Sequence, residues 1–292
     1  MSDYVVTCTS TCDLEKQMLD DYGIPYVCFK MIVDDSTYDD NFFADYPYEK
    51  FYDDIANGLM PTTSQVGYGP YLEMFEKILS SGKDVLHICL SSGISGDYST
   101  AVMVAHELNE KYENKVTIID SLGASSGYGM LTIMAYENMK RGMSYQDNIA
   151  FLESNKLKIH HWFISTDLSS YVRGGRISKT AGFFGSALKI CPLMHMPSDG
   201  SLMPLEKIRT KTKAKQAMID KMLEYADLGQ DYEDRAWLSC SNCEADAEDV
   251  KKMIIENFPH IKEIRIFKVG MTIGAHTGPG TVALYFIGKS RD

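Results

Sequence analysis

The chain has 292 residues, 45% of them hydrophobic and 24% charged, and its 29 basic and 40 acidic side chains give a formal net charge of −11. A chain of this length buries roughly three quarters of its unfolded surface, suits two domains, and needs no metal or disulfide to stabilise its core. Because phosphate binding requires a basic face, this charge argues against a nucleic-acid partner.

No uncharged run approaches the roughly 20 apolar residues that cross a bilayer, so we expect no stable membrane insertion. Residues 1–11 contain Asp3 and no basic region before a short apolar run, so we expect no secretory signal peptide. The cysteines are odd in number and scattered, as in proteins of a reducing compartment. Together these features predict a cytoplasmic protein.

Up to about residue 155, short β-prone runs alternate with helical runs, which predicts a parallel sheet flanked by helices. The predicted strands span residues 4–7, 26–33, 85–90 and 116–119, and the predicted helices span residues 13–22, 70–79, 99–112 and 127–140. Residues 34–54 are rich in acids and aromatics but contain no D-x-D-x-D-G loop. We therefore expect a solvated, partly packed surface segment there rather than a calcium site.

Beyond residue 158 the strands are more widely spaced, which predicts a second, mixed α/β domain. The predicted strands are 159–165, 189–194, 205–209, 236–239, 263–269 and 282–287, and the predicted helices are 213–225 and 246–258. The apolar segment 180–188 must be buried against protein or an apolar ligand if it is helical. We thus predict an α/β fold with an N-terminal domain (1–155) and a C-terminal domain (156–292).

Residues 90–99, with the sequence LSSGISGDYS, leave a predicted strand and open a helix. Free backbone N–H groups, hydroxyls and two glycines at a helix N-terminus suit an anion, although a plain capping loop explains them equally well. Ser95 does not complete the G-x-S-x-G nucleophile elbow, because Asp97 stands where the last glycine belongs.

Two further segments are open to the same pair of explanations. The hydroxyl-rich turn 61–65, which contains Thr63, is first of all a capping motif. Residues 270–280 are expected to form a long glycine-rich turn between two strands, in which His276 and Thr277 are as well explained by function as by chance. Cys240 and Cys243 have C-x-x-C spacing, but no second ligand pair supports zinc.

Together these motifs resemble the DegV family of bacterial fatty-acid-binding proteins. The matching segments, in family order, are STCDL at 10–14, TSQ at 63–65, SGISG at 92–96, Asp120-Ser121 with Ser125, Gly127 and Gly129, GGRIS at 174–178, Arg209-Thr210, and HTGPG at 276–280. Each match is weak alone, whereas seven in order form a specific signature. Two positions depart from the family pattern: Thr9 replaces an acid, and Arg173 replaces a lysine.

The resemblance implies one long-chain fatty acid held between two domains, with no metal or nucleotide cofactor. The family's carboxylate contacts map onto Thr63, Ser95, Gly96, His276, Thr277 and, as a neighbour, Arg176. In part of the family the protein presents the acid to a partner kinase, which phosphorylates the carboxylate for phospholipid synthesis.

Arg209 is the candidate docking residue for that kinase, within the basic run Lys207, Arg209, Lys211, Lys213 and Lys215. A solvated strand-to-helix face explains this run equally well. The competing hypotheses for the whole chain are an acyl-ester or thioester hydrolase that uses Ser95 and His276, and a sensor for a small anion without an acyl tail.

Overall fold

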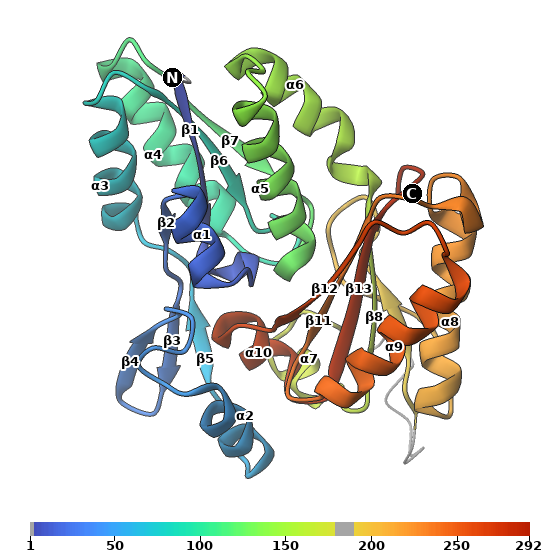
Figure 1. Cartoon of the computed structure of the whole chain (residues 1–292). Helices are drawn as coiled ribbons and strands as arrows, with labels where there is room; N and C mark the ends of the chain where they lie inside the picture. The colour runs from blue at the N-terminus through green and yellow to red at the C-terminus, as the bar shows by residue number, and fades with distance from the viewer. Residues whose placement is uncertain (1–2, 179–189) are drawn as a thin grey trace.

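The computed structural model describes residues 3–178 and 190–292. The N-terminal half contains a parallel four-stranded sheet in the order β2–β1–β6–β7 (Figure 1). Its strands are β1 (Tyr4–Thr9), β2 (Tyr26–Val27), β6 (Asp84–Cys89) and β7 (Val116–Asp120). Its helices are α1 (Lys16–Tyr22), α3 (Tyr68–Leu79), α4 (Asp97–Lys111), α5 (Ser125–Lys140) and α6 (Tyr145–Asn155).

Burial on both faces explains why this sheet is parallel. The sequence of β6 is apolar at four of its six positions, and its residues after Asp84 are all buried. Helix α4 buries the stripe that its periodicity predicts, including Ala101, Val104 and Leu108. Figure 1 shows α3 and α4 on one side of the sheet and α5 and α6 on the other. The predicted helix-flanked parallel sheet is confirmed.

The C-terminal half forms a mixed six-stranded sheet in the order β10–β9–β8–β13–β11–β12, in which only β11 and β12 pair in parallel. Its strands are β8 (Ile159–Ser165), β9 (Leu193–His195), β10 (Met203–Glu206), β11 (Arg235–Cys240), β12 (Glu263–Lys268) and β13 (Thr281–Ile287). Helices α8 (Lys211–Tyr225) and α9 (Glu244–Asn257) cover one face, whose core includes Trp162 and Ile164. Phe163 and Tyr285 belong instead to the core shared with the N-terminal half.

A small antiparallel sheet, β4–β3–β5, belongs to the N-terminal half and packs against residues 271–277 of the C-terminal half. It consists of β3 (Lys30–Val33), β4 (Ser36–Asp39) and β5 (Thr62–Ser64), and helix α2 (Tyr48–Ala56) follows β4. The aromatic residues of the predicted surface segment bury one another here, and Phe51 and Tyr52 are fully buried beside Met271 and Ala275. The segment is therefore an additional small core whose acids are mostly exposed.

Several predicted boundaries are wrong. The predicted strand 26–33 divides into β2 and β3, which belong to different sheets. The predicted turn at 61–65 contains β5, and the predicted glycine-rich turn contains helix α10 (Met271–Thr277). Elements not predicted are β4, α2 and α6, together with the short elements η1 (Ser10–Cys12), η2 (Lys156–Lys158), α7 (Ser169–Arg173) and η3 (Gly229–Asp231).

Three further expectations concern the domain boundary, the segment 180–188 and membrane insertion. The expected boundary at residue 155 coincides with the end of α6, immediately before η2. Segment 180–188 lies outside the described residues. Within residues 3–178 and 190–292, no helix is long and apolar enough to cross a membrane.

Candidate ligand-binding site

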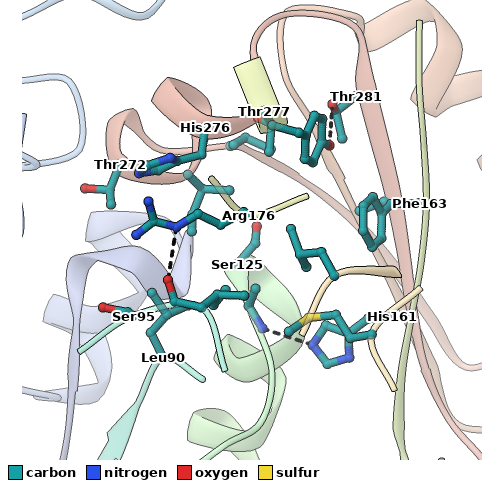
Figure 2. Close-up of a pocket in the computed structure, with 18 of the residues that line it drawn as sticks. Leu90, Ser95, Ser125, His161, Phe163, Arg176, Thr272, His276, Thr277 and Thr281 are labelled. Atoms are coloured by element: carbon teal, nitrogen blue, oxygen red, sulfur yellow. Dashed lines mark hydrogen bonds between the residues drawn. The ribbon is translucent and has the colours of Figure 1, made fainter. Parts of the chain in front are cut away.

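A cavity lies where the two large sheets and the small sheet meet (Figure 2). Its walls come from β5, the loop before α4, the start of α5, β8, the segment after α7, α10 and β13. All six residues that the resemblance assigns to a carboxylate site line this one cavity, namely Thr63, Ser95, Gly96, Arg176, His276 and Thr277. Residues separated by more than two hundred positions in the sequence are thus brought together.

Thr63 and His276 are hydrogen-bonded across the cavity wall, with Oγ1 and Nε2 separated by 2.7 Å. Burial, and to a smaller extent the nearby cations Arg176 and Arg173, lowers the pKa of His276 to about 4. The imidazole is therefore neutral at pH 7. Its Nδ1 atom is buried without a partner among the described residues. Nδ1 faces Gly174, where an added Cβ would lie only 2.2 Å away.

The N-terminus of α4 faces the same end of the cavity. Gly96 is its N-cap, and the Gly96 N–H has no hydrogen-bond acceptor among the described residues. The side chain of Ser95 accepts a hydrogen bond from the Asp97 N–H at 3.2 Å, so its own hydroxyl proton is free to point elsewhere. Unsatisfied N–H groups and the helix dipole make this end of α4 attractive to an anion.

Arg176 is the one side chain in the described lining that carries a permanent charge, and no acidic residue accompanies it there. Its Nε donates to the Ile94 carbonyl at 3.1 Å and its Nη1 donates to the Gly174 carbonyl, whereas Nη2 has no partner among the described residues. Burial lowers the pKa of the guanidinium without neutralising it. The whole protein has a net charge of −11, whereas the charged side chain in this lining is a cation. The cavity therefore favours a negative ligand.

The opposite end of the cavity is different in character. Figure 2 shows His161 and Phe163 across the cavity from Thr272 and Ser95. His161 donates through Nδ1 to the Ile159 carbonyl at 3.0 Å and accepts the Ala124 N–H through Nε2 at 3.2 Å. Apolar residues line the cavity throughout, namely Phe29, Leu90, Ile94, Ala124, Phe163, Met196, Leu202, Val269, Ile273 and Ala283. Of these, Ala124, Phe163 and Met196 lie beside His161.

Several other polar side chains in the wall bond within the protein. Tyr171 and Thr281 share a hydrogen bond of 2.9 Å, and the Ser125 hydroxyl donates to Asp13 at 2.5 Å. These groups have no need of a ligand partner, so the surface they present is mostly carbon. The cavity thus has one end with free donors and one end suited to an alkyl chain.

The sequence did not single out Asp40 or His161. Asp40 is buried, and its carboxylate accepts the N–H groups of Met271 and Thr272 at 3.2 Å each, which fixes the start of α10 and so the position of His276. It looked like one acid among many in an acidic stretch. His161 looked like a strand residue, and only its tertiary bond to Ala124 identifies it as part of the wall.

The two departures from the family pattern lie outside the cavity lining. The Thr9 hydroxyl is buried and bonds to the hydroxyls of Thr11 and Tyr128, at 2.7 Å each. Arg173 donates to Ser170 Oγ at 3.1 Å. Neither substitution removes a group from the donor end of the cavity.

The basic run is divided by its packing. Lys215 is buried and paired with Asp246 and Asp249, and Lys211 is paired with Asp246. Arg209 is exposed and has no ion-pair partner among the described residues. The run therefore presents less free positive charge than its sequence indicates, and Arg209 and Lys213 are its exposed members without an ion-pair partner among the described residues.

Other chemistry has little support in the described residues. Burial raises the pKa of both Cys240 and Cys243 to about 12, which leaves them as unreactive thiols at pH 7. No three His, Cys, Asp or Glu side chains converge as a metal site within the described ranges. Ser95 and His276 share no hydrogen bond there, and no acid orients His276, so a nucleophile–base pair is not formed.

Comparison with known proteins gives consistent matches along the chain. The sequence model of the DegV family, described as uncharacterised proteins, matches residues 4–289. A DegV domain-containing protein of Clostridium perfringens is 34% identical over 100% of both chains. The structure of DegV from Bacillus subtilis, described as a fatty acid binding protein, is 29% identical and covers 99% of this chain and 100% of its own, with a TM-score of 0.85.

A second solved structure is still more similar in shape. A DegV family protein from Thermus thermophilus, described in terms of fatty acid binding, has a TM-score of 0.89 at 24% identity. The match covers 98% of this chain and 99% of that one. At this identity the likeness supports the fold, which agrees with the two-sheet α/β arrangement described above.

Proposed function

This chain belongs to the DegV family, and we propose that it binds one long-chain fatty acid in the cavity between its two large sheets. The observation that carries this proposal is the polarity of the cavity. Free donors and one cation lie at one end, and the polar groups of the other end bond within the protein. A ligand with a single anionic head and an alkyl tail satisfies both ends.

We assign the carboxylate to the donor end, where a buried charge is costly unless it receives hydrogen bonds. The assigned groups are the hydroxyls of Thr63, Ser95 and Thr277, the Gly96 N–H, the His276 imidazole and the guanidinium of Arg176. Charge-assisted hydrogen bonds to a carboxylate are roughly twice as strong as neutral ones. Arg176 supplies the opposite charge, and the Gly96 N–H lies at the positive end of a helix dipole.

The tail then supplies most of the affinity. Burial of about 14 methylenes at ~0.8 kcal/mol each contributes roughly 11 kcal/mol, which exceeds the several kcal/mol lost on association. The similarity to the Bacillus subtilis protein, described as a fatty acid binding protein, supports the same ligand class for this chain.

We further propose that the chain is not itself an enzyme and uses no metal or nucleotide of its own, and that it presents the bound acid to a fatty acid kinase catalytic subunit. Arg209 is the proposed docking residue, because it is exposed and unpaired among the described residues. Arg209→Glu should abolish phosphorylation of the acid by such a kinase while fatty acid binding stays unchanged. Lys213→Glu, an equivalent charge reversal on the exposed face of α8, is the control.

Native mass spectrometry of the purified protein tests the ligand. We expect a bound mass that matches an acid of about 14 to 18 carbons, and stoichiometric rebinding of palmitate after delipidation. A protein that purifies empty and ignores added palmitate would contradict the proposal. A displacement series over chain length distinguishes the carrier from a sensor of small anions, because only the carrier gains affinity with each methylene.

A further inference from the structure

Arg291 is a buried cation that connects the two halves of the protein. Only 7% of its surface is exposed. Its Nη1 donates to the Met196 carbonyl at 3.0 Å, and its Nη2 donates to the Leu122 carbonyl at 2.8 Å. Leu122 belongs to the loop between β7 and α5, whereas Met196 follows β9. One guanidinium thus joins a loop of the N-terminal half to a loop of the C-terminal half.

Both loops form the apolar end of the cavity. The Met196 N–H donates to the His161 carbonyl at 3.3 Å, and the Ala124 N–H donates to His161 Nε2 at 3.2 Å. His161, Met196 and Ala124 all line the cavity. Figure 2 places His161 on the side opposite Thr272 and Ser95. Arg291 therefore holds together the two segments that flank His161, across the cavity from Thr272 and Ser95.

The loop fits closely against His161, so a small displacement would change the shape of the wall. A Cβ added at Gly123, within this loop, would lie 2.8 Å from His161 Nε2. Leu122 adopts a positive φ of 48°, a conformation that costs a non-glycine residue energy and needs outside support. The hydrogen bond from Arg291 to the Leu122 carbonyl provides that support.

Arg291 is also an uncommon choice for a purely structural position. It has no ion-pair partner among the described residues, although burial of an unpaired cation is costly. Burial lowers the pKa of Arg291 to about 10, and burial followed by the charge of Arg291 keeps the pKa of His161 well below its usual range. A neutral His161 keeps Nε2 free to accept the Ala124 N–H. The planar fork of arginine suits two carbonyls on separate segments.

We propose that Arg291 is a positioning residue that fixes the far wall of the cavity and thereby sets the preference for fatty acid chain length. This inference rests on the proposed function, and it concerns a residue that does not line the cavity itself. Only the terminal methylenes of a long acid reach the wall formed by His161, Met196 and Ala124. Loss of the Arg291 bridge should therefore weaken long acids and spare short ones.

The test compares delipidated full-length protein with its Arg291→Gln and Arg291→Lys variants, titrated with saturated acids from about 10 to about 18 carbons. In the wild-type protein each added methylene should tighten binding by roughly fourfold until the far wall is reached. In Arg291→Gln the shortest acids should bind within about twofold of wild type, and the gain for each terminal methylene should fall below about twofold. Arg291→Lys, which keeps the charge without the planar fork, should give intermediate gains.

Arg235→Gln is the matched control. Arg235 also joins the two halves, through a two-point ion pair with Glu137 at 2.9 and 3.0 Å, but it does not line or flank this cavity. It should lower stability and leave the gain per methylene unchanged. Wild-type gains per methylene in both Arg291 variants, or an equal reduction in Arg235→Gln, would overturn the inference. Failure of the wild-type protein to bind any acid would instead refute the proposed function.

Discussion

The Thr63 hydroxyl lies 2.7 Å from Nε2 of His276, although 213 positions separate the two residues in the sequence. Thr63 comes from β5 of the small sheet, and His276 comes from α10 of the C-terminal half. The contact depends on α2, because the Tyr52 hydroxyl donates to the Val269 carbonyl at 2.9 Å, two residues before α10 begins. The acidic, aromatic segment thus positions one part of the donor end against the other.

Thr63→Val and His276→Ala should each weaken fatty acid binding by about 1 to 3 kcal/mol, because the carboxylate loses a hydrogen bond that solvent cannot replace. Isothermal titration with palmitate measures the effect. Thr9→Val is the matched control, since it removes a buried hydroxyl that bonds to Thr11 and Tyr128 outside the cavity lining. Unchanged affinity in both cavity variants would refute the carboxylate assignment.

Gly174→Ala should weaken binding without a change to any donor. The new methyl group would lie 2.2 Å from His276 Nδ1, so the imidazole must move away from Thr63. We expect an affinity loss close to that of His276→Ala. The double variant Gly174→Ala/His276→Ala should lose little more affinity than either single variant, because both changes act on the His276 imidazole. Gly69→Ala, where no atom lies within 4 Å of the added methyl group, is the control. Fully additive losses in the double variant would contradict this mechanism.

The alternation of short apolar runs and amphipathic runs predicted the core of both sheets. Strands such as β6 and β8 could be identified as short β-prone runs, which are buried at nearly every position, and helices such as α4 could be identified by one amphipathic period from end to end. The break between β2 and β3 could not be predicted, since Cys28 and Phe29 continue the apolar run and only the tertiary fold sends the two pieces to different sheets.

The donor end of the cavity could be predicted from motifs, whereas its supports could not. Helix α10 was hidden by the four glycines of residues 270–280, and it forms because Asp40 caps its first N–H groups and Tyr52 packs on Gly274. Such contacts join residues more than two hundred positions apart and leave no local pattern. The role of Arg291 could not be predicted either, because its contacts with Met196 and Leu122 are also tertiary and leave no local pattern.

Asp97→Asn should alter the pH dependence of stability. Asp97 is buried in the first turn of α4, and burial raises its pKa to about 7, although the Tyr71 hydroxyl that donates to it at 2.8 Å acts in the opposite direction. The unfolded chain releases this proton near pH 3.8 while the native protein keeps it until about pH 7. The free energy of unfolding therefore falls as pH rises across that window, by up to roughly 4 kcal/mol.

Asparagine cannot titrate and still offers Tyr71 an acceptor, so the variant should lose this decline and be more stable than wild type above about pH 7. Urea unfolding at several pH values measures the difference between the two proteins, in which the contributions of the other titrating groups cancel. If the free energies of unfolding of the variant and the wild type changed in parallel with pH, the pKa of Asp97 would not be raised by folding and the prediction would be wrong.

His87→Phe should alter the pH dependence of stability at the acidic end, where it should make the protein more stable than wild type. His87 is fully buried in β6, with Nδ1 2.8 Å from Thr7 Oγ1 and with the rings of Tyr71 and Phe75 packed edge-on at 5.2 Å. Burial lowers its pKa to about 3, whereas the unfolded chain binds a proton near pH 6.5. Wild-type stability is therefore lost as pH falls from about 6.5 towards 3, by up to roughly 5 kcal/mol.

Phenylalanine fills a similar volume and takes up no proton, but it leaves the Thr7 hydroxyl without its partner, at a cost of about 1 kcal/mol. The two stability profiles should cross, with the variant weaker near neutral pH and stronger near pH 4. His106→Phe, the same exchange at a side chain that is 77% exposed, should leave the acid slope unchanged. Urea unfolding at each pH decides the outcome, and a variant that remains weaker than wild type down to about pH 4 would refute the assigned role of His87.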